Sequence, residues 1–198
     1  MAYSSCAADL AANIAMDCAQ PIVGGYTGRA VLVQWEDAPI IVQNANNPRK
    51  ITSITLGTGV KTIVVDNAFV TPFDGSQTSS NTDSGRVLYG KQLLIRVPKR
   101  GADASKNIIE PLHSSAMGFL AVVEKKDKTS DGAFEVIGYC SPLKATGDGT
   151  SRNENENGGD TLVKLECFEP FFELDLVPTG GTYADGLTAF ETLIAAAV

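Results

Sequence analysis

The side chains that could carry acid–base or nucleophilic chemistry are few in this sequence. His113 is the single histidine among 198 residues, so a Ser-His-Asp triad or a histidine general base would depend on it alone. It stands between Leu112 and Ser114 near a predicted helix end, where a capping or surface role is the usual one. The sequence contains no Gly-x-Ser-x-Gly nucleophile elbow. We therefore expect a protein that is not an enzyme.

Two stretches share some features with ligand-binding loops. Residues 55–62 contain the glycines and lysine of a phosphate-binding loop, but Val60 separates the last glycine from Lys61 and a strand follows. A hairpin turn is the favoured interpretation. Residues 148–160 are rich in oxygen ligands, but Arg152 stands where a calcium loop needs a ligand. A solvated loop is favoured there over weak cation binding, so we expect no cofactor and no metal site.

The sequence holds four cysteines at spacings that match neither zinc sites nor a disulfide scaffold: Cys6, Cys18, Cys140 and Cys167. The first two share a predicted helix over 4–18, which would hold them apart. The last two lie on predicted strands, 134–140 and 161–167. Antiparallel pairing of these strands would place the two sulfurs too far apart for a disulfide. We expect buried free thiols and an intracellular protein.

The charge balance limits the possible partners. The chain has 23 acidic and 16 basic residues, a net charge of −7, which disfavours the phosphate neutralisation on which nucleic-acid binding depends. The alanine-rich start, residues 6–19, is interrupted by Asp9 and Asp17 and falls short of the ~18 apolar residues of a membrane span. It also lacks a basic n-region. We expect no export signal and no membrane anchor.

The clearest predicted element is a β-hairpin over 119–139. An apolar run leads into charged residues, and a second run alternates after an Asp-Gly turn. The alternation predicts five core residues: Phe119, Ala121, Val123, Phe134 and Val136. The opposite face would carry Glu124 or Glu135 together with Lys126, and a register slip of one residue would exchange the two faces.

The remaining patterns predict a mainly β chain, a β-sandwich or open barrel with one internal helix and a helix at each end. We divide it into an N-terminal helical arm and linker (1–28), a β core (29–178) and a C-terminal helix (179–198). The other predicted strands are 29–35, 40–43, 51–56, 61–66, 87–97 and 161–168. The predicted helices are 4–18, 102–114 (with Asp103 as its cap) and 183–198. Two long polar segments, 71–86 and 147–160, are predicted loops.

The order of elements in the core is similar to that of a known protein family. The strand Lys91-Gln-Leu-Leu-Ile-Arg-Val97, the helix 102–114 and the strands Phe119–Lys125 and Ala133–Tyr139 together resemble the core of bacteriophage major tail tube proteins. The resemblance covers roughly residues 29–178. It implies two sheets flanking a helix and hexameric rings that stack into a tube. The implied partners are further copies of the chain and other virion proteins, with DNA only in passage, and the implied location is the virion, assembled in the host cytoplasm.

The resemblance also suggests roles for particular residues. Charged strand positions would line an acidic lumen that offers DNA no phosphate-binding sites, and the candidates are Glu124, Glu135, Lys164 and Glu166. The simpler alternative is that these charges only face water. The long loop 71–86 would contact neighbouring subunits, with Phe73, Asp74, Asp83 and Arg86 as its candidate residues.

Two other functions remain open at this point. A capsid decoration or head–tail connector protein would also be β-rich and chemically inert. A ligand- or carbohydrate-binding β-sandwich would use the loops 71–86 and 147–160 as its binding rim. Phe73 is the single aromatic residue of those loops, whereas sugar binding favours exposed Trp or Tyr.

Overall fold

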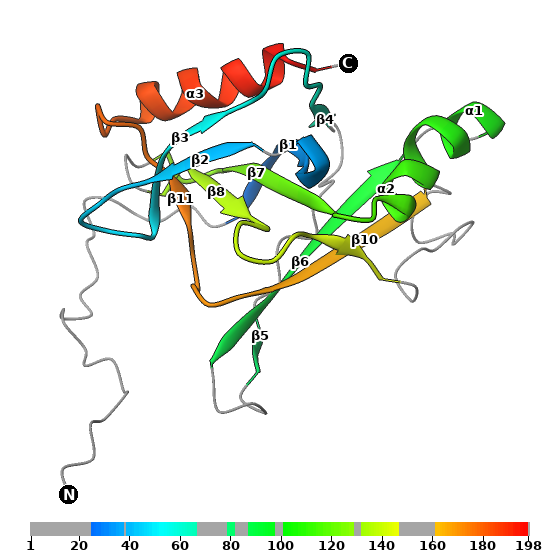
Figure 1. Cartoon of the computed structure of the whole chain (residues 1–198), viewed down its shortest axis with the longest axis horizontal. Coiled ribbons are helices and arrows are strands. Elements are labelled where there is room, and N and C mark those ends of the chain that lie inside the picture. Colours follow the sequence, from blue (N-terminus) through cyan, green and yellow to red (C-terminus); the bar gives the residue numbers. More distant parts are fainter. Residues whose placement is uncertain are drawn as a thin grey trace, which may run out of the picture.

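The computed structural model describes residues 25–37, 39–66, 79–81, 87–97, 101–128, 132–146 and 161–197. Two sheets and several helical segments make up these residues (Figure 1), which confirms the predicted mainly β fold with an internal and a C-terminal helix; the first sheet does not close into a barrel. The predicted N-terminal helix and the loop 147–160 lie outside the described residues.

The first sheet has seven strands in the order β2-β3-β11-β8-β7-β1-β4. Their bounds are β1 (Tyr26–Gln34), β2 (Ile40–Gln43), β3 (Lys50–Thr55), β4 (Ile63–Asp66), β7 (Phe119–Lys125), β8 (Phe134–Ile137) and β11 (Asp175–Leu176). The central strands β7 and β8 are buried almost throughout. Such strands need apolar side chains on both faces, which explains the unbroken apolar run at the start of β7. Strands β3 and β4 do not pair with each other, so the prediction of a hairpin turn within 55–62 was wrong.

Strands β7 and β8 form the predicted hairpin, with Ala121 opposite Ile137 and Glu124 opposite Phe134. All five predicted core residues are buried, but they do not share one face. Phe119, Ala121 and Val123 pack on one side of the sheet, and Phe134 and Val136 pack on the other. The register causes this division, because directly opposed residues of an antiparallel pair point to the same face.

The second sheet has the order β5-β6-β10-β9, with bounds β5 (Ser79–Asn81), β6 (Leu88–Val97), β9 (Lys144–Ala145) and β10 (Thr161–Glu169). Strand β10 pairs along its whole length with β6, from Thr161 opposite Val97 to Glu169 opposite Tyr89. The antiparallel pairing of 134–140 with 161–167 expected from the sequence was therefore wrong, since the alternating pattern of β10 pairs with the similarly long and alternating β6. The segment 71–86, predicted to be without regular structure, contributes strand β5.

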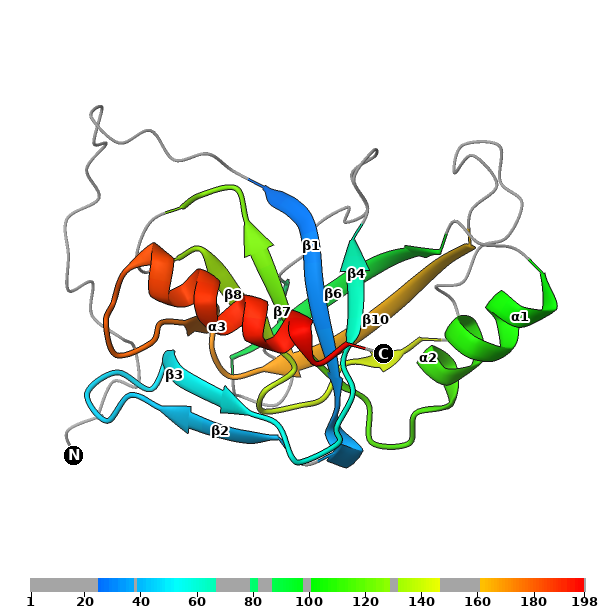
Figure 2. The ribbon, with the colours of Figure 1, turned by 90° about the horizontal axis from the view of Figure 1, so that it is seen from above.

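The molecule has three layers, with the seven-stranded sheet in the middle (Figures 1 and 2). One of its faces packs on the second sheet through residues such as Leu93, Ile95 and Val163. The other face packs on helix α3 (Tyr183–Ala195) through Phe190 and Leu193. The C-terminal helix is thus part of the subunit's own core. It begins with a capping box between Thr182 and Asp185.

The internal helix runs through α1 (Ala102–Ala104), the π-helical segment η2 (Ser105–Ile109) and α2 (Glu110–Ser114). The predicted span is confirmed, and Ile109 and Leu112 pack into the core between the sheets. The predicted cap was wrong: Gly101 precedes the helix and Asp103 lies in its first turn. Pro111 is accommodated within the first turn of α2, directly after the wider π turn.

Candidate functional site

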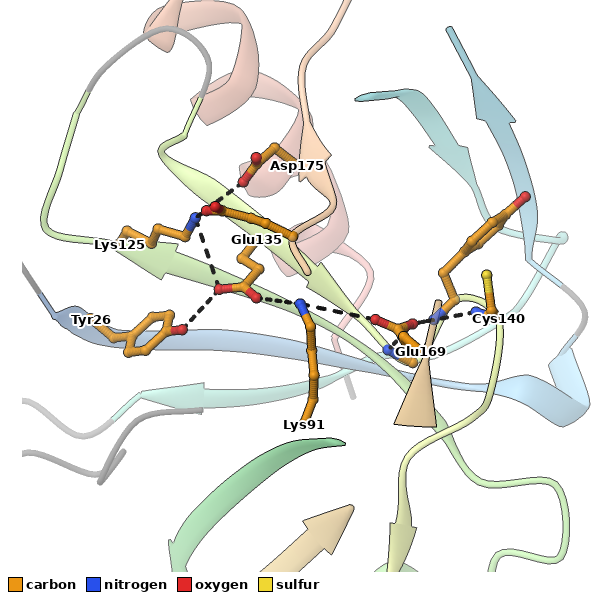
Figure 3. A network of polar contacts seen from close by, with 10 residues as sticks. Tyr26, Lys91, Lys125, Glu135, Cys140, Glu169 and Asp175 are labelled. Carbon is orange, nitrogen blue, oxygen red and sulfur yellow. Dashed lines mark hydrogen bonds and ion pairs between the residues drawn. The ribbon is translucent and has the colours of Figure 1, made fainter. Parts of the chain in front are cut away.

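A network of charged side chains extends into the space between the two sheets (Figure 3). Its centre is Lys91, whose side chain is 0% exposed. Lys91 belongs to the face of β6 that also carries the buried Leu93 and Ile95, so the strand directs its ammonium group into the sandwich. The Lys91 Nζ atom donates a hydrogen bond of 2.7 Å to Glu135 Oε1 and lies 4.0 Å from Glu169 Oε2. A buried ammonium is tolerated only with such partners.

Glu135 extends from β8 and meets Lys91 across the gap between the sheets. It is 5% exposed, and the hairpin register sets it opposite Val123, which faces the same core. Its second oxygen, Oε2, accepts a hydrogen bond of 2.8 Å from the Tyr26 hydroxyl and lies 3.8 Å from Lys125 Nζ. Each oxygen of this carboxylate therefore has its own cation or donor.

Glu169 stands at the end of β10 and is 0% exposed. Its Oε1 accepts backbone hydrogen bonds from Gly138, Tyr139 and Cys140 at 3.0, 2.6 and 3.3 Å. Gly138 makes this arrangement possible: its φ is +90°, and a Cβ atom there would lie 2.5 Å from the carbonyl oxygen of Phe119. Glu169 Oε2, in contrast, has no hydrogen-bond partner within the described residues.

The network approaches solvent through Lys125. This side chain is 14% exposed and donates a hydrogen bond of 3.2 Å to Asp175 on β11. It also pairs with Glu173, which is 41% exposed. The network thus runs from a fully buried end at Glu169 to an accessible end at Glu173.

Burial makes two carboxylates of this network, Glu169 and Asp175, hold protons more tightly than usual. Desolvation raises the pKa of Glu169, although Lys91 and the three backbone amides counteract the effect. Desolvation also raises the pKa of Asp175, to about 6, although Lys125 opposes it. Four carboxylates share two lysines here, so the site combines an amine with buried acids that can take up and return protons.

The two thiols near Glu169 are both free. Cys167 is buried, and desolvation raises its pKa to about 12. Cys140 is exposed, although partial burial raises its pKa as well. The prediction of buried free thiols is therefore confirmed for Cys167 and was wrong for Cys140; Cys6 and Cys18 lie outside the described residues.

A third buried carboxylate, Glu124 on β7, lies outside this network and faces helix α3. It accepts hydrogen bonds from Thr27 at 3.0 Å and from Tyr183 at 3.2 Å. Arg29 and Lys128 approach it at 3.5 and 3.7 Å. These contacts connect β1, β7 and the start of α3.

The predicted lumen residues fall into two groups. Glu124 and Glu135 are 2% and 5% exposed, so the prediction that they point outward was wrong. In a sheet covered on both faces, each charge turns toward a covering layer. Glu135 meets Lys91 of that layer, whereas the cations of Glu124 come from β1 and from the segment after β7. Lys164 and Glu166 do lie on the outward face of β10, half-exposed and paired with each other. The candidate loop residues Phe73, Asp74, Asp83 and Arg86 lie outside the described residues.

Sequence reasoning missed Lys91 and Glu169, although the alternation of inward and outward residues along each strand could have identified them. Lys91 has the same parity as the apolar Leu93 and Ile95 of its strand, and Glu169 has the same parity as Cys167. Extending each alternation by one more step would have placed both charges in the core.

Within the described part of the chain, no cluster of three or more His, Cys, Asp or Glu side chains is arranged to hold a metal ion. Helices there are all too short or too polar to cross a membrane. A scan against protein-family models, a search of curated proteins and a search of solved structures each found no match for this chain.

Proposed function

We propose that this chain is a structural protein of a bacteriophage virion that assembles with copies of itself as the subunit of a tail tube. The observation that carries the proposal is an apolar edge on the first sheet. Strand β2 pairs with β3 alone, and its Ile40 and Val42 are 66% and 47% exposed. An edge with unpaired backbone groups and exposed β-branched residues favours pairing with another chain.

The outward face of the second sheet supports a role in the tube. Lys164 and Glu166 form an ion pair on this face, and Gln92 donates a hydrogen bond of 3.0 Å to Glu166. Charges that are already paired, on a chain of net charge −7, give little attraction to DNA phosphates. A wall of this kind suits passage of DNA without binding.

Exposed apolar side chains also lie at and just beyond the C-terminal end of β10. Phe168 and Phe172 are 50% and 59% exposed, and Phe172 makes an edge-to-face contact with Tyr89. Exposed aromatic side chains are enriched in protein–protein contacts. Together with β2 they offer the exposed apolar contacts that a ring of identical subunits requires.

Electron microscopy of the purified full chain at rising concentration tests this function. We expect rings or filaments with a regular axial repeat and a central channel. The double variant Ile40→Lys/Val42→Lys should stay monomeric, because charges on an edge strand oppose pairing. Met117→Lys, at a site 53% exposed and outside strand β2, is the matched control and should still assemble.

The other outcomes would replace the tail tube with a different function. A chain that stays monomeric or trimeric alone but coats isolated capsids would be a decoration or connector protein. A monomer that binds glycans in an array would be a carbohydrate-binding sandwich. Assembly by the edge variant as well as by the native chain would contradict the role of β2.

A further inference from the structure

We propose that Lys91 and Glu135 condense to an intramolecular amide bond, which joins the two sheets of the sandwich covalently. Lys91 belongs to β6 of the second sheet, and Glu135 belongs to β8 of the first. The bond would connect residues 44 positions apart in sequence. It forms within one subunit, so it does not depend on the proposed assembly.

The two reacting groups are held in contact by rigid elements. Strand β6 is fixed by its nine-residue ladder with β10, and β8 lies between β7 and β11. Lys91 Nζ is 2.7 Å from Glu135 Oε1, which is bonded to the carboxyl carbon that the amine would attack. Positioning of this kind raises the effective concentration of one group near the other to roughly 10⁵–10⁸ M.

The oxygen that would gain negative charge already has its donors. Attack of Nζ on the carboxyl carbon moves electrons onto Glu135 Oε2. That atom accepts a hydrogen bond of 2.8 Å from the Tyr26 hydroxyl and lies 3.8 Å from the Lys125 ammonium. A hydroxyl and a cation placed in advance at a developing oxyanion lower the barrier to acyl transfer.

Glu169 is placed to carry the proton. Its Oε1 is fixed by three backbone amides, whereas its Oε2 has no hydrogen-bond partner in the described residues and lies 4.0 Å from Lys91 Nζ. This carboxylate is fully buried, which raises its pKa. A positioned acid–base group with such properties speeds proton transfer in amide formation by about 10²–10⁴-fold.

The reaction balances without any further reactant. The Lys91 ammonium first gives a proton to Glu135 Oε1, and the resulting amine attacks the carboxyl carbon. Glu169 Oε2 then takes a second proton from Nζ and passes it to the Oε1 hydroxyl, which leaves as water. The C=O bond re-forms to Oε2, and Glu169 returns to its starting state. One ammonium and one carboxylate become one amide and one water molecule.

Burial favours the product. In water a carboxylate and an ammonium are strongly hydrated and resist condensation. Inside the sandwich both have lost that hydration, and the Lys91 side chain has no exposed surface. Replacing a buried ion pair by a neutral amide removes the cost of keeping two charges out of water.

Intact-mass spectrometry of the purified full chain is the first test, and we expect a mass lower than the sequence mass by one water molecule. Proteolysis should yield a branched peptide that joins Lys91 to Glu135. The Lys91→Met variant should show the full sequence mass. Lys164→Met, at a half-exposed lysine of the same sheet, is the matched control and should keep the deficit. Glu169→Gln should form the bond at least about 100-fold more slowly.

Succinimide formation at an Asp-Gly pair such as Asp131-Gly132 also removes one water, so the peptide map decides the origin of any deficit. A native chain of full sequence mass would overturn the proposal. So would a deficit that persists in Lys91→Met or maps to an Asp-Gly pair. The peptide map of the native chain gives the answer even if the Lys91 variant does not fold.

Discussion

Two buried glutamates of the same hairpin, Glu124 and Glu135, are held in opposite ways. Glu124 faces helix α3, and its cations Arg29 and Lys128 are 32% and 56% exposed. Glu135 faces the second sheet, and its nearest cation, Lys91, is 0% exposed. Solvent therefore reaches the cations that pair with Glu124, but it is excluded from Lys91, the main partner of Glu135.

This difference shows what the surroundings of a buried charge decide. Around Glu124, water screens the exposed partners, so each ion pair contributes little and can be replaced. Around Lys91, loss of one partner leaves the others buried without compensation. The ion pairs of Glu124 beside the helix layer therefore tolerate change, whereas the inter-sheet layer depends on each member of its network.

Removal of the buried lysine should have the largest effect. Lys91→Met should lower the free energy of unfolding by at least about 3–5 kcal/mol, because Glu135 and Glu169 would stay buried without Lys91 and no bond could join the two sheets. Lys128→Met, the corresponding change beside Glu124, should cost about 0–1 kcal/mol. Urea denaturation of both variants measures the difference, and equal losses would contradict the distinction between the two sites.

The accessible end of the network should respond to pH. Burial raises the pKa of Asp175 from 3.8 to about 6, so the folded state holds this proton more tightly than the unfolded state. The contribution of Asp175 to stability is therefore greatest at low pH and falls as the pH rises through about 6, by about 3 kcal/mol in all. Asp175→Asn should remove this part of the pH dependence.

Unfolding in urea between pH 4 and pH 7 measures that effect as the difference between the native chain and the variant. Asp103→Asn changes an exposed aspartate of helix α1 and serves as the control, which should keep the native profile. An unchanged profile in Asp175→Asn would show that Asp175 is not the group responsible.

Gly138, which belongs to the backbone segment that binds the Glu169 carboxylate, offers a third test. Gly138→Ala should cost at least about 2 kcal/mol, because its positive φ is combined with a contact to the Phe119 carbonyl. Gly59 also has a positive φ but open space around it, so Gly59→Ala should cost only about 1 kcal/mol. Thermal unfolding compares the stability of the two variants. Similar losses of stability would mean that the positive φ alone, and not the contact with Phe119, determines the cost.

Smaller effects than that of Lys91→Met should come from the two tyrosines that donate to the two glutamates. Tyr26 donates to Glu135 and Tyr183 to Glu124, at 2.8 and 3.2 Å. Tyr26→Phe should cost about 1.5–3 kcal/mol and Tyr183→Phe about 0.5–1 kcal/mol, since only Glu124 has exposed cations to compensate. Urea denaturation measures both losses of stability. A larger loss in Tyr183→Phe than in Tyr26→Phe would contradict the difference between the two glutamates.

Much of the fold could be predicted from local patterns. Alternation over 87–97 and 161–168 gave two strands close to their observed bounds, and the internal and C-terminal helices followed from their apolar spacing. Strand partners could not be predicted in this way. The pairing of β10 with β6 joins residues far apart in sequence, and the local pattern of a strand fits more than one partner.

The candidate site was hidden for a related reason. Charged residues on strands were expected to face water, which holds for a sheet with one solvated face. Here the middle sheet is covered on both faces, so Glu124 and Glu135 have no solvent side to occupy. Which layers cover a sheet depends on the whole chain, and the hairpin sequence alone does not contain that information.

Two double-mutant cycles test the central claim most directly. One combines Lys91→Met with Glu135→Gln, and the other combines Lys128→Met with Glu124→Gln, each followed by urea unfolding. We expect a coupling energy above about 2 kcal/mol for the buried pair and below about 1 kcal/mol for the pair beside α3. Coupling energies of similar size at the two glutamates would contradict it.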